Sequence, residues 1–120
     1  INDTYGHTSG DQVLRTLSAL LQKEVGNAGF VGRYGGEEFI IVLPDTFARS
    51  ACSLASRVLA KLQKLPIVVA DAPQPLFITA SLGVAQLQHQ PPDTFDEFVK
   101  RADEAMYEAK TQGRCRVCQR

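Results

Sequence analysis

The sequence has no tryptophan, one methionine and no net charge, because 13 basic residues balance 13 acidic ones. A neutral chain exerts no long-range attraction on nucleic acid or on an acidic membrane surface, so we expect no nucleic-acid partner. No apolar run is long enough to cross a membrane, and no secretory signal peptide is recognisable. With 120 residues, 44% of them hydrophobic, the chain can build one core but not two, and we expect a single domain over residues 1–120.

Cysteine is also scarce. Three cysteines cannot all pair with one another, and Cys52 falls in a helical pattern where it is expected to pack as a small hydrophobe. Cys115 and Cys118 form a lone C-x-x-C pair, whereas a zinc site needs about four ligands. We therefore expect no zinc or redox site there, and a reducing, cytoplasmic setting.

Hydrophobic spacing and capping patterns predict the helices. The first residues are expected to end a short helix that turns at Gly6. A capping box from Thr8 to Asp11 then opens a longer helix, which Gly26 ends. A second helix is predicted over residues 47–65, and a third begins at a capping box formed by Thr94 and Glu97.

The remaining apolar segments read as strands, including one long strand with a bulge near Gly83. They cover residues 30–34, 39–43, 67–69, 76–87 and 116–118. Helices alternating with a hairpin and later strands predict an α+β sandwich, in which helices pack on a mostly antiparallel central sheet.

The hairpin between residues 30 and 43 holds Gly35, Gly36, Glu37 and Glu38 at its tip. Adjacent glycines suit a tight turn with positive backbone dihedrals, and their missing side chains let phosphates of a ligand approach the backbone. Successive strand residues point to opposite faces, so one glutamate should face the turn and could hold a divalent metal. A surface turn with solvated glutamates is the alternative.

Several motifs accompany this hairpin in a fixed order. They are the segment Ile1 to His7, Gly10-Asp11, Arg33 to Phe39, Ser81 to Ala85, Arg101 to Lys110, and Gly113-Arg114. Together they resemble the GGDEF family of diguanylate cyclases, in the GGEEF variant, from the first residue to nearly the last. The resemblance implies a ferredoxin-like or palm-type sandwich.

The same resemblance implies an activity. Such enzymes condense two GTP molecules into cyclic di-GMP and release pyrophosphate, with Mg²⁺ or Mn²⁺ as cofactor. Each domain binds one GTP, so two GGDEF domains must meet in a homodimer. Sensory or other signalling domains are expected in a longer parent protein, which is either free in the cytoplasm or anchored to a membrane.

The family's acidic and guanine-binding positions carry over residue by residue. Glu37 matches the metal ligand that also helps to deprotonate the attacking hydroxyl, and Glu38 is a supporting acid or a solvated charge. Asn2 and Asp11 match guanine-contacting residues, because an amide and a carboxylate complement the guanine edge. Capping of the helix is the rival role for Asp11. His7 either touches the ligand or caps a turn.

The phosphate-binding positions also carry over. Gly35 and Gly36 would let the nucleotide lie on the turn, while Lys110 and Arg114 match cations that hold the triphosphate. Favourable charge at the end of a helix is a second role for those cations. Arg33 lies beside the hairpin and either serves the site or pairs with a glutamate.

The chain departs from the family pattern at three places. The strand that precedes Asn2 in the family, with its metal-binding aspartate, is not in the sequence, so we expect an N-terminally incomplete domain. Gly26 and Gly29 replace the Arg-x-x-Asp pair that binds inhibitory product. Cys115 stands where asparagine is common.

Two other functions remain open at this point. One is a catalytically inactive GGDEF regulatory module that binds GTP or a partner domain. The other is a ferredoxin-like RNA-binding domain, which would need exposed stacking aromatics and a basic face.

Overall fold

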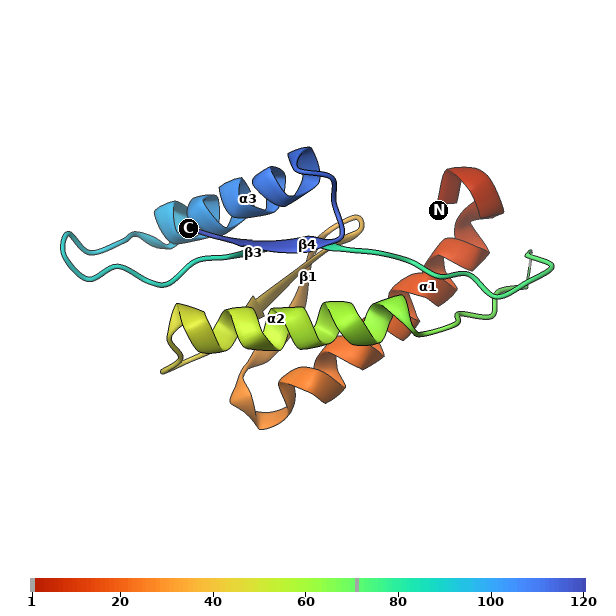
Figure 1. Cartoon of the computed structure of the whole chain (residues 1–120), viewed down its shortest axis with the longest axis horizontal. Coiled ribbons are helices and arrows are strands. Elements are labelled where there is room, and N and C mark those ends of the chain that lie inside the picture. Colours follow the sequence, from red (N-terminus) through yellow and green to blue (C-terminus); the bar gives the residue numbers. More distant parts are fainter. Residues whose placement is uncertain (1, 71) are drawn as a thin grey trace. The chain divides into compact units, whose positions relative to one another are not determined.

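The computed structural model describes residues 2–70 and 72–120, with side chains from residue 10 onward. The elements follow in the order α1 (Asn2–Val25), η1 (Gly26–Ala28), β1 (Phe30–Gly35), β2 (Glu38–Val42), α2 (Ala48–Gln63), β3 (Ser81–Val84), α3 (Phe95–Thr111) and β4 (Arg116–Gln119), as labelled in Figure 1. They form two compact units, one of Ile1–Pro44 and Ala60–Ile78 and the other of Asp45–Leu59 and Thr79–Arg120.

The first unit begins with α1, which runs without a break past Gly6. The predicted turn at Gly6 and the capping box from Thr8 to Asp11 are therefore wrong. A glycine inside a helix costs only about 1 kcal/mol, and the surrounding hydrogen-bonded turns outweigh it. The predicted apolar stripe is confirmed, since Val13 and Val25 are both buried. The helix ends as predicted at Gly26, whose φ of +53° suits a residue without Cβ.

Strands β1 and β2 form an antiparallel hairpin beside α1, which packs on β1. The pairing runs from Phe30 opposite Val42 to Gly35 opposite Glu38, and it is irregular between Arg33 and Gly35. The two predicted strands are confirmed. The irregularity at the tip, which the sequence does not reveal, matters for the candidate site.

The rest of this unit closes a small apolar core. Val13 packs with Ile67 and Val69, and partly buried side chains surround them, namely Leu65, Ala72, Leu76 and Ile78. The strand predicted over residues 67–69 is reduced to a single bridge between Ile67 and Leu76. Asp71 lies outside the described residues.

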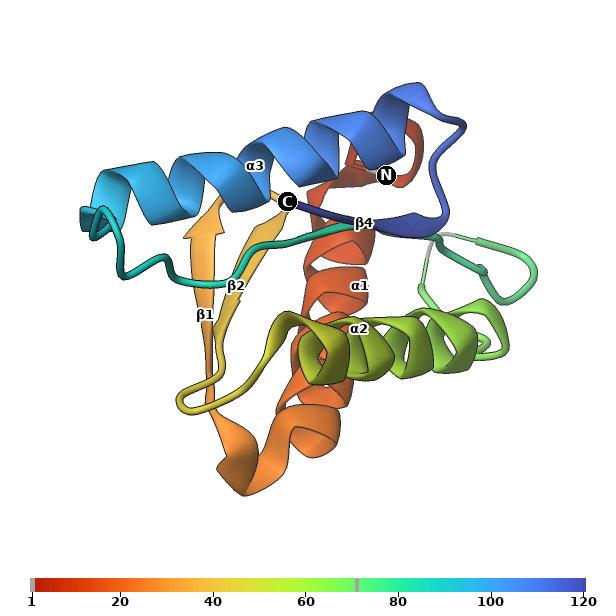
Figure 2. The same cartoon turned by 60° about the vertical axis from the view of Figure 1, so that its left-hand side comes forward.

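The second unit consists mainly of β3, α3 and β4. The two strands pair in parallel, with Ser81 opposite Arg116 and Val84 opposite Gln119, and α3 packs along both strands (Figures 1 and 2). The strand predicted over residues 76–87 is thus shorter than expected, because its partner supplies only four residues. The α+β class is confirmed. Within the described part of the chain, the strands form one antiparallel and one parallel pair rather than a single mostly antiparallel sheet.

Gly83 explains how closely α3 approaches β3. A Cβ at this position would lie 2.1 Å from the carbonyl oxygen of Ala102 and 2.2 Å from the amide nitrogen of Met106. Ala105 and Ala109 on the same helix are fully buried. Small residues on the strand and the helix therefore set the spacing between their backbones, in place of the bulge that was expected near Gly83.

The start of α3 is fixed by local hydrogen bonds. Thr94 and Glu97 form the predicted capping box, in which each side chain accepts from the other's backbone N–H. The carboxylate of Asp93 accepts from the amide of Gln88 at 2.7 Å and pairs with Arg101. The Gln88 amide first, and then Arg101, hold the pKa of Asp93 below its ordinary value of 3.8.

Helix α2 contributes residues to both units. Its predicted apolar stripe is confirmed, since Leu54, Val58 and Leu62 are all buried. It begins one residue later and ends two residues earlier than predicted, at Ala48 and Gln63. Such a difference is normal at helix ends.

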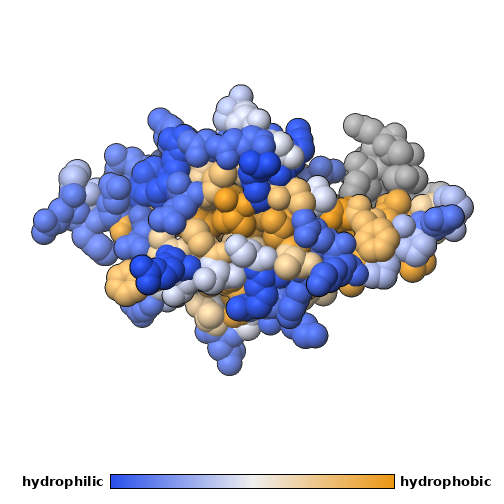
Figure 3. Space-filling model, in the orientation of Figure 1, coloured by the Kyte–Doolittle hydropathy of each residue, from blue (hydrophilic) through white to orange (hydrophobic). Residues whose placement is uncertain are grey.

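A space-filling view shows apolar surface in orange between polar side chains (Figure 3). Large apolar side chains stay exposed in each unit, including Phe30 in one and Phe47 and Phe95 in the other. None of the described helices combines the length and the apolar composition that a membrane span requires.

Candidate functional site

The tip of the β1–β2 hairpin is a two-residue turn made by Gly36 and Glu37. Neither Gly35 nor Gly36 has a positive φ, so the expectation of positive dihedrals there is wrong. The irregular pairing near Tyr34 closes the turn instead. A Cβ built on either glycine meets no atom of the described residues within 4 Å. Neither the backbone dihedrals nor the protein's own packing thus requires glycine at these two positions.

Two carboxylates flank this open turn. Glu37 belongs to the turn itself, and Glu38 is the first residue of β2. The expected alternation of the two glutamates along one strand therefore does not apply. Both side chains are exposed, and no hydrogen bond or ion pair of either is found among the residues that the structure describes. Both carboxylates are available to a ligand.

Arg33 is tied to the same turn. Its Nη2 donates a hydrogen bond to the carbonyl oxygen of Gly36, and its guanidinium lies 5.9 Å from the ring centroid of Phe39. The alternative pairing of Arg33 with a glutamate is not observed within the described chain. The arginine instead fixes one carbonyl of the turn, which limits the conformations open to Glu37.

The predicted guanine-binding residues belong to α1. Asn2 and His7 are helical, and their side chains lie outside the described part of the molecule. Because the chain is helical at His7, the turn-capping role considered for this residue is wrong. Asp11 is exposed in the interior of α1, well beyond the first turn, so capping does not explain it either.

The two candidate cations lie at the end of α3. Lys110 is in the last turn of the helix, where its charge also suits the helix dipole. Gly113 has a φ of +116°, and the amide of Arg114 donates to the carbonyl oxygen of Ala109 at 2.8 Å. This is the hydrogen bond of a Schellman cap, and it turns the exposed Arg114 out of the helical path.

Arg116, which the sequence does not single out, braces this cap. Its Nε donates to the carbonyl oxygen of Arg114 at 3.1 Å, and a Cβ on Gly113 would lie 3.0 Å from its Nη2. The only sequence signal is its place two residues after Arg114 at the start of a predicted strand.

The predicted site residues thus form two groups. Arg33, Gly35, Gly36, Glu37 and Glu38 meet at the hairpin tip of the first unit, which also contains Asp11. Lys110 and Arg114 belong to the second unit.

The residues present fit a metal shared with a nucleotide. Among the described residues there is no cluster of three or more histidine, cysteine or acidic side chains that could enclose an ion alone. Magnesium, however, is usually held by one or two carboxylates together with substrate phosphates. The exposed carboxylate of Glu37 beside an open turn suits that mode of binding.

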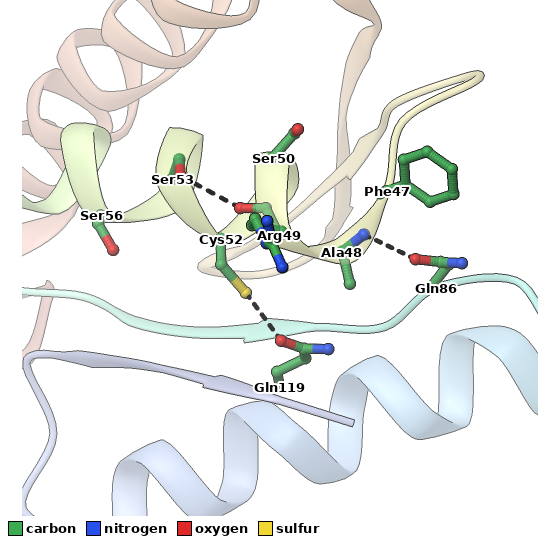
Figure 4. Close-up of a pocket in the computed structure, with 9 residues that line it drawn as sticks. All are labelled: Phe47, Ala48, Arg49, Ser50, Cys52, Ser53, Ser56, Gln86 and Gln119. Carbon is green, nitrogen blue, oxygen red and sulfur yellow. Dashed lines mark hydrogen bonds between the residues drawn. The ribbon is translucent and has the colours of Figure 1, made fainter.

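A separate shallow pocket opens at the start of α2, and it contains none of the predicted site residues (Figure 4). Several of its polar side chains have protein partners. Gln86 accepts from the amide of Ala48 at 2.7 Å, and the thiol of Cys52 points to the side-chain oxygen of Gln119 at 3.4 Å. The packing expected for Cys52 is observed only in part, because the residue is half-buried.

The described residues form an α+β fold, with an exposed Gly-Gly hairpin beside a long helix in one unit and two cations at the end of α3 in the other. Comparison with known families identifies it further. The family described as "Diguanylate cyclase, GGDEF domain" matches residues 1–116. The chain belongs to the GGDEF family, as its motifs predict.

The relatives of the chain agree. It is 42% identical over 117 residues to diguanylate cyclase DgcM of Escherichia coli, a match that covers 98% of the chain and 27% of DgcM. The chain spans about a quarter of the length of the curated relatives it matches.

Solved structures show the same fold. Diguanylate cyclase SiaD of Pseudomonas aeruginosa, in complex with its activator SiaC, has a TM-score of 0.90 and 35% identity over 100% of this chain and 45% of that one. The active GGEEF domain of a diguanylate cyclase from Vibrio cholerae has a TM-score of 0.81 and 34% identity, covering 99% and 73% of the two chains.

Proposed function

We propose that the chain is the catalytic GGDEF domain of a diguanylate cyclase, which condenses two GTP molecules into cyclic di-GMP. One observation carries the proposal. The space above Gly35 and Gly36 is open, although the fold would accept a side chain at either position. Glycine here is explained by a ligand that lies on the turn.

The chemistry assigned to the hairpin is a nucleotidyl transfer. The 3′-oxygen of one GTP forms a bond to the α-phosphorus of the other, the bond from that phosphorus to the pyrophosphate breaks, and the hydroxyl proton leaves the attacking oxygen. Glu37 would accept that proton or hold the metal, and Glu38 would support it. A bound Mg²⁺ or Mn²⁺ would supply neutralisation of phosphate charge.

Substrate recognition is assigned to the remaining motif residues. Asn2 and Asp11 would contact guanine, with His7 as a further ligand contact. The elimination of capping as a role for Asp11 supports this assignment. Lys110 and Arg114 would bind the triphosphate, and Arg33 would hold the carbonyl of Gly36 so that the turn keeps its shape.

The proposed reaction needs two copies of the domain, because each contributes one GTP. We accordingly propose a homodimer as the active form, regulated by other domains of a longer cytoplasmic or membrane-anchored protein. The rate of an isolated domain should therefore rise more steeply than linearly with protein concentration.

Inhibition by the product through an Arg-x-x-Asp pair is not expected. At Gly29 a Cβ would lie 2.1 Å from the carbonyl oxygen of Val42, so an aspartate does not fit without movement of the backbone. Gly26 has a positive φ, which disfavours arginine. Calorimetric titration with cyclic di-GMP should give no heat of binding at micromolar concentrations, and micromolar affinity would contradict this part of the proposal.

The decisive experiment is an assay of purified protein with GTP and Mg²⁺ in which cyclic di-GMP is resolved by chromatography. Glu37→Gln should abolish product formation. Asp96→Asn removes an exposed carboxylate outside the hairpin, in the second unit, without a change of volume. It is the matched control and should leave turnover nearly unchanged.

Two outcomes would count against catalysis. Turnover by Glu37→Gln at the wild-type rate would remove the assigned role of this residue. GTP binding without any product at high protein concentration would indicate the inactive regulatory module instead.

A further inference from the structure

We propose that Arg116 is a positioning residue for Arg114, and that it acts through its Nε hydrogen bond rather than through its charge. The inference rests on the proposed function of Arg114 as a triphosphate-binding cation. It starts from an unusual backbone segment at the end of α3.

Three consecutive residues in this segment have a positive φ. The values are +116° at Gly113, +63° at Arg114 and +50° at Cys115. Only the first is a glycine, and side chains with a Cβ disfavour this region. The segment keeps this conformation only if neighbouring groups hold it.

Both peptide groups of Arg114 are held. Its amide donates to the carbonyl oxygen of Ala109 at 2.8 Å, and its carbonyl oxygen accepts from Nε of Arg116 at 3.1 Å. The first bond comes from the helix and the second from the strand. Together they set the direction in which the exposed Arg114 side chain leaves the backbone.

Arg116 is itself held in place by the sheet. Its own backbone pairs with Ser81 in the β3–β4 ladder. Its guanidinium passes over Gly113, where an added Cβ would lie 3.0 Å from Nη2. Cys118 lies two residues further along β4, on the same face of the strand as Arg116. Its thiol makes a weak contact, at 3.7 Å, with the side-chain oxygen of Gln112, the C-cap residue of α3. The strand thus braces the cap of the helix from which Arg114 emerges.

Two substitutions separate the hydrogen bond from the charge. Arg116→Gln places an amide nitrogen at the same distance along the side chain as Nε and removes the charge. Arg116→Lys keeps the charge but has only a methylene at that point. If Arg116 positions Arg114, the KM for GTP should stay within about twofold for Gln and rise about tenfold for Lys, with kcat less affected in both. The reverse order would show direct binding of phosphate by Arg116 and overturn the proposal.

A double-mutant cycle and a rescue add to the test. In an Arg114→Ala background, Arg116→Lys should have no further effect on KM, because it acts through the missing side chain. Asparagine tolerates a positive φ, so Cys115→Asn should restore much of the KM lost in Arg116→Lys. An undiminished effect of Arg116→Lys in the Arg114→Ala background would contradict the proposal.

A readout without nucleotide keeps this test separate from the proposed function. NMR couplings and carbon chemical shifts of the 120-residue chain report the φ of Arg114 directly. They should show a positive φ in the wild type and in Arg116→Gln, and a change in Arg116→Lys. An unchanged φ in Arg116→Lys would overturn the proposal even if the chain proves inactive, whereas inactivity with the expected φ change would refute only the proposed function.

Discussion

Substitution of Gly36 by alanine separates the needs of the fold from those of the ligand. The added methyl group meets no described atom within 4 Å, and the backbone is outside the positive-φ region. Alanine at such a position stabilises a protein by about 0.4–1 kcal/mol, because it restricts the unfolded chain. We therefore expect Gly36→Ala to unfold at the same or slightly higher urea concentration than the wild type.

Activity should change in the opposite direction. A methyl group in the space assigned to the nucleotide should lower kcat/KM at least about tenfold, which corresponds to about 1.4 kcal/mol of lost transition-state stabilisation. Circular dichroism in urea and the chromatographic assay for cyclic di-GMP measure the two effects on the same preparation.

Gly83→Ala is the matched control for this experiment. Its Cβ would lie 2.1 and 2.2 Å from backbone atoms of Ala102 and Met106, which cannot move as a flexible side chain can. Overpacking of this kind costs about 1–3 kcal/mol or more, so this variant should unfold at a lower urea concentration. The reasoning is refuted if Gly36→Ala is destabilised as much as Gly83→Ala, or if it keeps wild-type kcat/KM.

Three further predictions concern stability. Thr94→Ala removes half of the capping box of α3 and should cost about 1 kcal/mol in urea unfolding, and an effect below the error of that measurement would contradict the cap. Cys115→Asn places a residue that tolerates φ of +50° and should raise the free energy of unfolding by several tenths of a kcal/mol to about 1 kcal/mol, whereas a destabilised variant would show that no strain is relieved. The backbone N–H groups of Gln88 and Thr94 are the chief causes that lower the pKa values of Asp93 and Glu97 below 3.8 and 4.5. The two carboxylates therefore contribute their full stabilisation of the folded state above those values. This contribution is lost as the pH falls through the lowered folded-state pKa values. Urea unfolding between about pH 7 and about pH 3 measures this loss, and Asp93→Asn should make the pH dependence shallower.

Local chemistry explains which parts of the fold could be predicted. The capping box at Thr94 and the helix end at Gly26 depend on groups within a few residues, and both are observed. The apolar stripe of α2 could be predicted because its apolar residues recur with the period of a helix. The same reasoning failed at Asp11, where a capping pattern occurs inside a longer helix.

Pairing between distant residues explains what could not be predicted. The length of β3 depends on how much of the chain around Arg116 lies beside it. The φ of Gly36 depends on the irregular strand pairing near Tyr34, which no local sequence pattern predicts. For the candidate site, the sequence predicted the hairpin, which is observed, while the roles of its residues and of the two cations stay predictions. The hydrogen bond from Arg116 to Arg114 could not be predicted, because these groups meet only once the cap has formed.

The close contact at Gly83 limits how far α3 could shift if a triphosphate were bound at its end. Because backbone meets backbone there, α3 cannot slide along β3 without a collision. Lys110 at the end of the helix and Arg114 in its braced cap are therefore tied to the strands on which α3 packs. If these cations bind a triphosphate, as proposed, little backbone entropy remains to be lost on binding, and the arrangement of the two cations is already set when the chain folds.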